Sequence, residues 1–161
     1  MQQPFEHTVT EHGPTVARVV RAVLGPGPDA DDAWSETFLA ALRAWPDLPE
    51  DTNVQAWLVR VAHRKAIDVT RGAARRAVPT DTLPERRATT GLPGSGEPDL
   101  WAAVAALPER QRLSLAYHYL GGLRHTETAE LIGGTPAAVR RAAADGLRTL
   151  RQTLAPEGAS R

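Results

Sequence analysis

Apolar side chains recur at helical spacing between residues 54 and 76. No proline interrupts this stretch, and its one glycine, Gly72, lies near the end. At about 100° per residue, the aliphatic side chains gather on one side of a helical wheel. They are Val54, Leu58, Val61, Ala62 and Val69. The pattern predicts one long helix over 54–76 with one side against a core.

Similar periodicity predicts helices at 5–24, 29–45, 99–107, 108–120, 126–132 and 135–154. Gly13 and Pro14 are expected to interrupt the first of these, because proline suits the first turn of a new helix. Asp29 or Asp31 is expected to cap the second. Its apolar stripe consists of Trp34, Phe38, Ala41, Leu42 and Trp45. The two tryptophans are interpreted as core residues in preference to ligand-binding residues.

Helical periodicity is lost between residues 77 and 98. This stretch holds four prolines, three glycines and four threonines, a composition typical of a flexible linker. The sequence therefore predicts an all-α protein with two small helical domains, 1–76 and 99–161, joined by a flexible linker over 77–98. A low aromatic content of 5% beside 42% hydrophobic residues also favours small helical cores over a sheet sandwich.

The last two predicted helices have the spacing of a helix-turn-helix. Gly133 and Gly134 provide the turn, and Thr135 and Pro136 provide the cap and first turn of the second helix. Its apolar side consists of Val139, Ala143, Leu147, Leu150 and Leu154. The opposite side carries Arg140, Arg141, Arg148 and Arg151. A basic face that begins at the helix start suits a reader of the DNA major groove, and the alternative is an ordinary helical hairpin with a solvated arginine face.

The net charge of the chain is zero, but the charges are unevenly distributed. Residues 1–57 carry three basic and nine acidic side chains, whereas residues 58–88 carry eight basic and three acidic ones. Within the long helix, an arginine row falls on one side of the wheel: Arg60, Arg64, Arg71 and Arg75. Trp57 lies at the edge of this row. Cations beside an aromatic plane suit single-stranded nucleic acid, while the alternative is again a solvated face.

Several other classes of site are not indicated. The chain has no cysteine, so disulfides and thiolate metal sites are excluded. The five histidines show no metal-ligand spacing, and neither a nucleophile elbow nor a phosphate-binding loop occurs. We therefore expect no enzyme activity, catalytic residue, metal or cofactor. Arginines cut the apolar runs short, and the first residues lack an export signal, so we expect a cytoplasmic protein without membrane insertion.

Three motifs in this order resemble those of one family. They are DADDAWSETFLAALRAW at 29–45, AWLVRVAHRKAIDVTRGAARR at 56–76, and LPERQRLSLAYHYLGGLRHTETAELIGG followed by TPAAVRRAAADGLRTLR over 107–151. The chain resembles the bacterial RNA polymerase sigma factors of the extracytoplasmic-function class. The resemblance covers nearly all of the chain except the linker and the tail.

The resemblance implies three contact surfaces. It assigns docking on the clamp helices of core RNA polymerase to Asp32, Ser35, Glu36 and Arg43. It assigns capture of the minus-ten promoter element to Asn53, Trp57, Arg60, His63, Arg64 and Arg71. It assigns reading of the minus-thirty-five element to Thr135, Pro136, Arg140, Arg141 and Arg148. The implied partners are core RNA polymerase and promoter DNA, with an anti-sigma protein as a further candidate and no small-molecule substrate.

The chain departs from the family pattern in both halves. Ser35 stands where the family usually has glutamine, and Arg124, a poor helix cap, stands where serine is common. Ala142, Ala144 and Asp145 thin the basic face of the recognition helix, which weakens the expected affinity for the upstream element. Two alternatives therefore stay open: a helix-turn-helix regulator that does not dock on polymerase, and a degenerate sigma-like helical adaptor.

Overall fold

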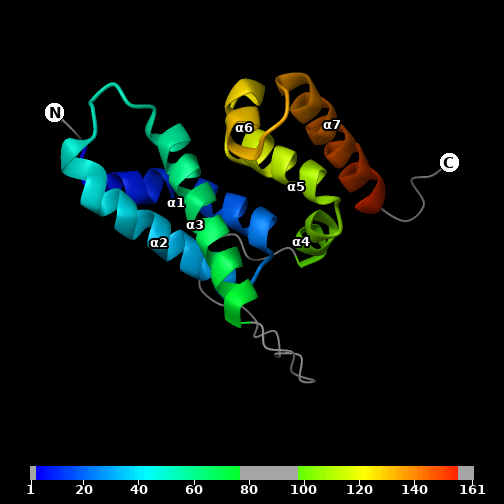
Figure 1. The fold of residues 1–161 in the computed structure, drawn as a ribbon, viewed down its shortest axis with the longest axis horizontal. Coiled ribbons are helices and arrows are strands. Elements are labelled where there is room, and N and C mark those ends of the chain that lie inside the picture. Colours follow the sequence, from blue (N-terminus) through cyan, green and yellow to red (C-terminus); the bar gives the residue numbers. More distant parts are fainter. Residues whose placement is uncertain (1–2, 77–97, 156–161) are drawn as a thin grey trace.

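The computed structural model describes residues 3–76 and 98–155, and all regular elements in these ranges are helical, which confirms the predicted all-α class. Figure 1 shows their arrangement. The elements are α1 (Phe5–Leu24), α2 (Pro28–Ala44), η1 (Trp45–Asp47), α3 (Val54–Arg76), α4 (Pro98–Ala105), α5 (Glu109–Leu115), η2 (Ala116–Leu120), α6 (His125–Ile132) and α7 (Pro136–Thr153). The predicted linker lies outside the described residues except for Pro98, which begins α4.

The first helix is continuous, so the predicted interruption at Gly13 and Pro14 is wrong. Pro14 lies inside α1 and cannot donate a hydrogen bond to the carbonyl four residues earlier. Contact with α2 also holds this segment, because the indole Nε1 of Trp34 donates to the carbonyl of Gly13 at 2.9 Å. A Cβ on Gly13 would lie 3.4 Å from the indole ring. Packing between α1 and α2 therefore supports a continuous helix where Gly13 and Pro14 alone predict an interruption.

The second helix begins earlier than expected. Gly27 is its N-cap and Pro28 its first residue, and no side chain caps it. Asp29 and Asp31 lie within the first turn, where their charges favour the helix dipole. The prediction that one of them is the cap is therefore wrong, because Pro28 is already suited to the first helical position.

Two leucines assigned to apolar stripes are exposed. Leu42 at the edge of the α2 stripe is 50% exposed, and Leu154 just after α7 is 41% exposed. A helical wheel assigns a residue to one side of its helix, but it does not show how much of that side a neighbouring helix covers. The central stripe residues behave as predicted, since Phe38, Ala41 and Val139 are buried.

Helices α1, α2 and α3 form the core of the N-terminal half, residues 3–76. Helix α3 has the predicted bounds, and Leu58, Val61 and Ala62 are almost completely buried, as its apolar side predicts. The main cluster consists of Val16, Val20, Ala30, Ala33, Phe38, Ala41, Leu58 and Ala62. Its rigid packing fixes the direction in which the polar sides of α2 and α3 face.

The C-terminal half, residues 98–155, packs directly against α1 and α3 (Figure 1). Ala22 of α1 belongs to a cluster with Trp101, Val104, Leu107, Leu115, Ala116 and Leu150. Val19, Ala56 and Val59 of the N-terminal half form another cluster with Tyr117 and Leu123. The two halves therefore share apolar cores across their interface.

The segment that follows α5 differs from the regular helix predicted through residue 120. η2 is a π-helix, and the N–H of Gly121 donates to the carbonyl of Ala116, five residues earlier, at 2.8 Å. Gly121 is pressed against α3, since a Cβ there would lie 3.0 Å from a methyl group of Val59. The wider turn lets the chain end its helix at this close approach, a feature that helix periodicity does not reveal.

Replacing Gly133 with alanine is expected to lower the free energy of unfolding by about 1–3 kcal/mol, because its backbone conformation is available almost only to glycine. Its φ is 86° and its ψ is 168°. Chemical denaturation measures the change. Gly146→Ala is the matched control, since Gly146 lies inside α7 where a Cβ would make only ordinary van der Waals contacts, and alanine favours the helix. A Gly133→Ala protein as stable as the control would contradict the assignment.

Candidate nucleic-acid interface

The predicted docking residues lie on the outer side of α2. Asp32, Ser35, Glu36 and Arg43 are all exposed. The first three line a polar hollow of about 440 Å³ together with Lys65, Asp68 and Val69 of α3. Arg43 lies farther along the same helix. The structure thus brings three of the four together and places the fourth about two turns away.

Leu39 is a candidate docking residue that the sequence reasoning missed. It is 47% exposed and lies three residues after Glu36 and four before Arg43, a spacing that puts all three on one side of α2. An exposed leucine among charged side chains suits a protein interface with a partly apolar centre. The available signal was an apolar residue outside the predicted apolar stripe.

The predicted minus-ten residues of α3 are in different environments. Arg64 and Arg71 are exposed, whereas Trp57 is half-buried against the N-terminal core with its ring centroid 6.4 Å from that of Trp45. Asn53 accepts a hydrogen bond at its Oδ1 from the backbone N–H of Ala56 at 3.1 Å, so it holds the first turn of α3. Much of the Trp57 side chain is thus used for packing, and the two arginines present the most accessible cations.

The other two predicted minus-ten residues contact the C-terminal half. The Nη2 of Arg60 donates to the Oε2 of Glu127 in α6 at 3.0 Å. The Nδ1 of His63 lies 2.7 Å from the hydroxyl oxygen of Tyr117. Near the start of α3, the Nε2 of Gln55 donates to the carbonyl of Gly121 at 3.1 Å. One end of the arginine row therefore faces the C-terminal half, and the other end faces solvent.

Two of these groups have shifted protonation equilibria. The pKa of Glu127 is lowered mainly by a hydrogen bond from the backbone N–H of Arg124. Burial acts in the opposite direction, and the guanidinium groups of Arg124 and Arg60 lower the pKa further. Burial raises the pKa of Tyr117, against the effect of Arg112. The carboxylate is therefore charged at neutral pH, and the phenol keeps its proton beside the imidazole of His63.

The protein is expected to lose stability as the pH falls below 6.5, the ordinary pKa of histidine. Burial lowers the pKa of His63, the carbonyl of Leu131 opposes this, and the charge of Arg64 adds to the lowering. Below this pH the unfolded chain binds more protons than the folded one. The free energy of unfolding therefore decreases as the pH decreases. Urea denaturation at about pH 7.5 and about pH 5.5 measures the loss.

A His63→Gln variant is the control for that pH dependence. Its loss of stability over the same interval should be smaller than that of the unsubstituted protein. It should not vanish, because burial, His118 and Arg140 also lower the pKa of His125. An equal loss in the two proteins would show that His63 does not contribute. The pKa of Glu127 is lowered from 4.5, so its titration lies below this interval.

The helix-turn-helix has the predicted caps. The hydroxyl oxygen of Thr135 accepts a hydrogen bond from the N–H of Ala138 at 3.1 Å, and Pro136 is the first residue of α7. At the start of α6, Glu127 accepts from the backbone N–H and from the Nε of Arg124, each at 3.0 Å. Glu127 thus holds the helix start that Arg124 caps poorly by itself.

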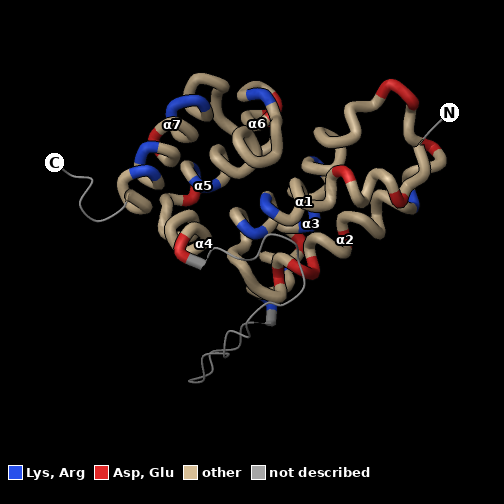
Figure 2. Tube along the Cα trace, turned by 180° about the vertical axis from the view of Figure 1, so that it is seen from behind, with Lys and Arg blue, Asp and Glu red and all other residues tan. Residues whose placement is uncertain are grey.

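The arginines of α7 are exposed, as predicted. Figure 2 shows basic segments at intervals along this helix. Arg140 and Arg141 lie in its first two turns, where a groove-reading helix places its base-contacting side chains. Arg148 is paired with Asp145 at 3.0 Å. This pair neutralises part of the basic face, so Arg140 and Arg141 are the stronger candidates for DNA contact.

Metal-ligand clusters and membrane spans do not occur within the described ranges. Residues 3–76 and 98–155 contain no group of three or more side chains that could hold a metal ion. Among the same residues, no helix combines the length and apolar character needed to cross a membrane.

Comparison with known proteins matches two segments of the chain to two families. Residues 8–76 match the family Sigma-70 region 2, and residues 98–150 match the family Sigma-70, region 4. The ECF RNA polymerase sigma factor SigD of Mycobacterium tuberculosis is 32% identical over 157 residues, which span 90% of this chain and 74% of SigD. ShbA of Streptomyces griseus is 34% identical over 133 residues, spanning 75% of this chain and 69% of ShbA.

Solved structures show the same fold. The sigma factor RpoE, in its complex with the anti-sigma factor NepR from Bartonella quintana, has a TM-score of 0.70 and 16% identity, covering 93% of this chain and 96% of RpoE. CnrH, in complex with the cytosolic domain of CnrY, has a TM-score of 0.61 and 24% identity, covering 93% of this chain and 86% of CnrH. At these identities the likeness concerns the arrangement of helices.

Proposed function

The chain belongs to the extracytoplasmic-function class of RNA polymerase sigma factors, which bind core polymerase and direct promoter-specific initiation, and we propose that α2, α3 and α7 divide this work. It is a DNA-binding transcription factor and not an enzyme. The division is supported by one observation above all: the exposed docking, minus-ten and minus-thirty-five residues lie on three different helices.

Helix α2 docks on core polymerase. Asp32, Glu36 and Arg43 are exposed, and opposite charges on the polymerase surface would recognise them and set the register of docking. Leu39 lies between Glu36 and Arg43 on the same side and supplies apolar area. Ser35 is shorter than the glutamine common in the family, so the charged residues carry a larger share of the contact.

Helix α3 captures the separated strand at the minus-ten element. Arg60, Arg64 and Arg71 are the cations for its phosphates, and the part of Trp57 that stays exposed offers a stacking edge. His63 lies three residues after Arg60 and so on the same side of the helix. Asn53 contributes indirectly, because its bond to Ala56 fixes the start of the helix.

Helix α7 reads the duplex at the minus-thirty-five element. Arg140 and Arg141 reach base edges, and Arg148 contacts phosphate only when it leaves Asp145. Thr135 and Pro136 fix the start of the helix and present its first backbone N–H groups toward the DNA. The neighbouring alanines add no charge, so upstream recognition depends on few contacts.

Reconstitution with core polymerase tests this function. Purified full-length chain is mixed with core enzyme from the same organism, and the mixture is examined for co-purification and for run-off transcription from a library of upstream fragments. A stable complex that initiates at a small set of promoters is expected. A helix-turn-helix regulator would bind duplex DNA without initiation, and an adaptor would do neither. Failure of co-purification with an active core enzyme would overturn the docking role.

The proposal also covers where the protein acts and which protein regulates it. Location in the cytoplasm follows from the need to reach promoter DNA and polymerase. An anti-sigma protein is a candidate regulator, since RpoE and CnrH, which share this fold, were solved with the anti-sigma factor NepR and with the cytosolic domain of CnrY. Co-purification of the tagged chain from its own organism would identify such a partner.

A further inference from the structure

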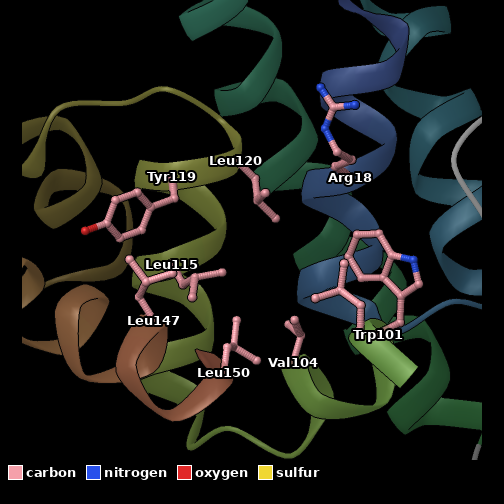
Figure 3. Close-up of a pocket in the computed structure, with 9 residues that line it drawn as sticks. Arg18, Trp101, Val104, Leu115, Tyr119, Leu120, Leu147 and Leu150 are labelled. Atoms are coloured by element: carbon pink, nitrogen blue, oxygen red, sulfur yellow. The ribbon is translucent and has the colours of Figure 1, made fainter. Parts of the chain in front are cut away.

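An apolar cavity of about 320 Å³ lies between α1 of the N-terminal half and α4, α5, η2 and α7 of the C-terminal half. Figure 3 shows the side chains around it. None of the residues assigned to the three proposed contact surfaces lines this cavity. Its volume falls within the range of about 300–1,000 Å³ that is usual for small-molecule sites. The cavity therefore has the size of a ligand site and no part in the docking and DNA contacts described above.

We propose that this cavity binds a medium-chain fatty acid. The alkyl chain lies among the aliphatic side chains, and the carboxylate is held at the rim by the guanidinium of Arg18. The site is independent of the division of work between α2, α3 and α7. It makes the chain a receptor for a small apolar acid as well as a transcription factor.

Hydrocarbon forms the walls of the cavity. Leu115 of α5, Leu120 of η2 and Leu150 of α7 surround it together with Val104 and the buried indole ring of Trp101, both from α4 (Figure 3). Such walls offer dispersion contacts to a flexible alkyl chain and cannot hydrogen-bond to a polar one. Each methylene group that leaves water for this surface should strengthen binding by up to about fourfold.

The rim of the cavity carries a positive charge. Among the described residues that line it, Arg18 alone is charged. Arg18 is exposed, and its Nη2 donates to the Oγ1 of Thr15 in the same helix at 3.4 Å, which is long for a hydrogen bond. Within residues 3–76 and 98–155 it forms no ion pair. Its guanidinium can therefore turn to a carboxylate and bind it through two parallel N–H donors.

Shape and charge together select this class of ligand. Several elements wall the cavity, so a single alkyl chain fits it better than a helix of a partner protein, which is about 10–12 Å across with its side chains. A cationic ligand would be repelled by Arg18, and a neutral hydrocarbon would make no use of it. The hydroxyl of Tyr119 points away from the cavity (Figure 3), so Arg18 is the polar group that meets the head of the ligand.

Titration of the full-length chain with decanoate, below the concentration at which it forms micelles, tests the site. The chain has four tryptophans, and their indole N–H signals can be followed by heteronuclear NMR. The signal of Trp101, assigned with a Trp101→Phe variant, should shift saturably, because this ring lines the cavity. The signals of the other three should stay in place, since Trp34, Trp45 and Trp57 pack in the N-terminal half. A dissociation constant of about 10 µM to 1 mM is expected for a ligand of this size.

A series of ligands separates the cavity from non-specific binding. Affinity should rise from hexanoate to the chain length that fills the cavity and then level off, whereas detergent-like binding would keep rising with length. Decanol, which has the same chain without the charge, should bind about 3- to 10-fold more weakly than decanoate. Decylammonium should bind more weakly still, because its charge has the sign of Arg18.

Two variants test the residues. Arg18→Glu reverses the charge at an exposed position, so it should bind decylammonium more tightly than decanoate. Arg75→Glu is the matched control, since Arg75 is exposed near the end of α3 and does not line the cavity. It should keep the original order. Leu147→Phe adds bulk to the wall formed by α7 and should weaken the binding of all three ligands. If circular dichroism showed that this variant is misfolded, Arg18→Glu would still decide the question.

A saturable shift of the Trp101 signal, with a preference for decanoate that Arg18→Glu reverses and Arg75→Glu keeps, supports the inference. The absence of saturable binding by decanoate would overturn it. Saturable binding that is equally strong for decanoate and decanol, or that is unchanged in Arg18→Glu, would overturn the role of Arg18 and with it the assignment to a fatty acid.

Discussion

Replacing Asp32 and Glu36 with lysine is expected to abolish promoter-specific initiation by the reconstituted holoenzyme. Both carboxylates are exposed on α2, so the fold should survive the change. At the interface with polymerase, each reversal replaces an attraction with a like-charge repulsion, which costs several kcal/mol. Polymerase binding should therefore fall by at least about a thousandfold, since about 1.4 kcal/mol is tenfold in affinity. Co-purification and run-off transcription measure the loss.

The matched control reverses two acids on another helix. Glu6 and Glu11 of α1 are exposed and lie outside the three proposed surfaces, so Glu6→Lys with Glu11→Lys changes the net charge equally. This control should keep most of its initiation. If the α2 variant initiated as well as the control, Asp32 and Glu36 could not be docking residues, and the polymerase contact would have to be sought among the other residues of α2, beginning with Leu39.

Replacing Arg140 and Arg141 with alanine should give the largest loss of duplex binding. Both are exposed at the beginning of α7, and each lost base contact costs about 1–3 kcal/mol. The double variant should therefore bind the minus-thirty-five duplex about 30- to 20,000-fold more weakly if both contact bases, and less if they contact only phosphate. Titration of the holoenzyme at fixed salt measures this loss, and a smaller salt dependence should accompany it.

Arg148→Ala is the comparison for this experiment. Its guanidinium already pairs with Asp145 at 3.0 Å, so it is less free to contact the DNA, and its removal should weaken binding less than the loss of two base contacts. Equal losses for Arg148→Ala and the double variant would mean that α7 does not approach the groove through its first turns. Unchanged binding in both would exclude this side of α7 from the DNA contact.

Local signals predicted much of the fold. The bounds of α3, the Thr135 cap and the Pro136 start of α7 follow from side chains within a few residues. Two of the errors arise where distant parts of the chain meet. Trp34 stabilises the helix through Gly13, 21 residues away, and Gly121 ends its helix against Val59. No periodicity within one segment carries that information.

In the candidate site, too, some features follow from the local sequence and others depend on contacts between distant residues. Exposure of Arg64, Arg140 and Arg141 follows from their places on a wheel. The pairing of Arg60 with Glu127 does not, because the two residues are 67 positions apart and the partner is chosen by the packing of the two halves. Leu39 lies outside the predicted apolar stripe of α2, and the structure shows that it is 47% exposed, so its place on the wheel was a signal that the sequence analysis did not use.

Helix α1 serves both halves of the molecule. Val16 and Val20 pack in the N-terminal core, while Val19 and Ala22 pack against the C-terminal half. Separation of the two halves would therefore expose an aliphatic strip of α1 to solvent. Chaperones and proteases recognise such surfaces. Any state of the protein in which the halves separate should thus be short-lived unless a partner covers this strip.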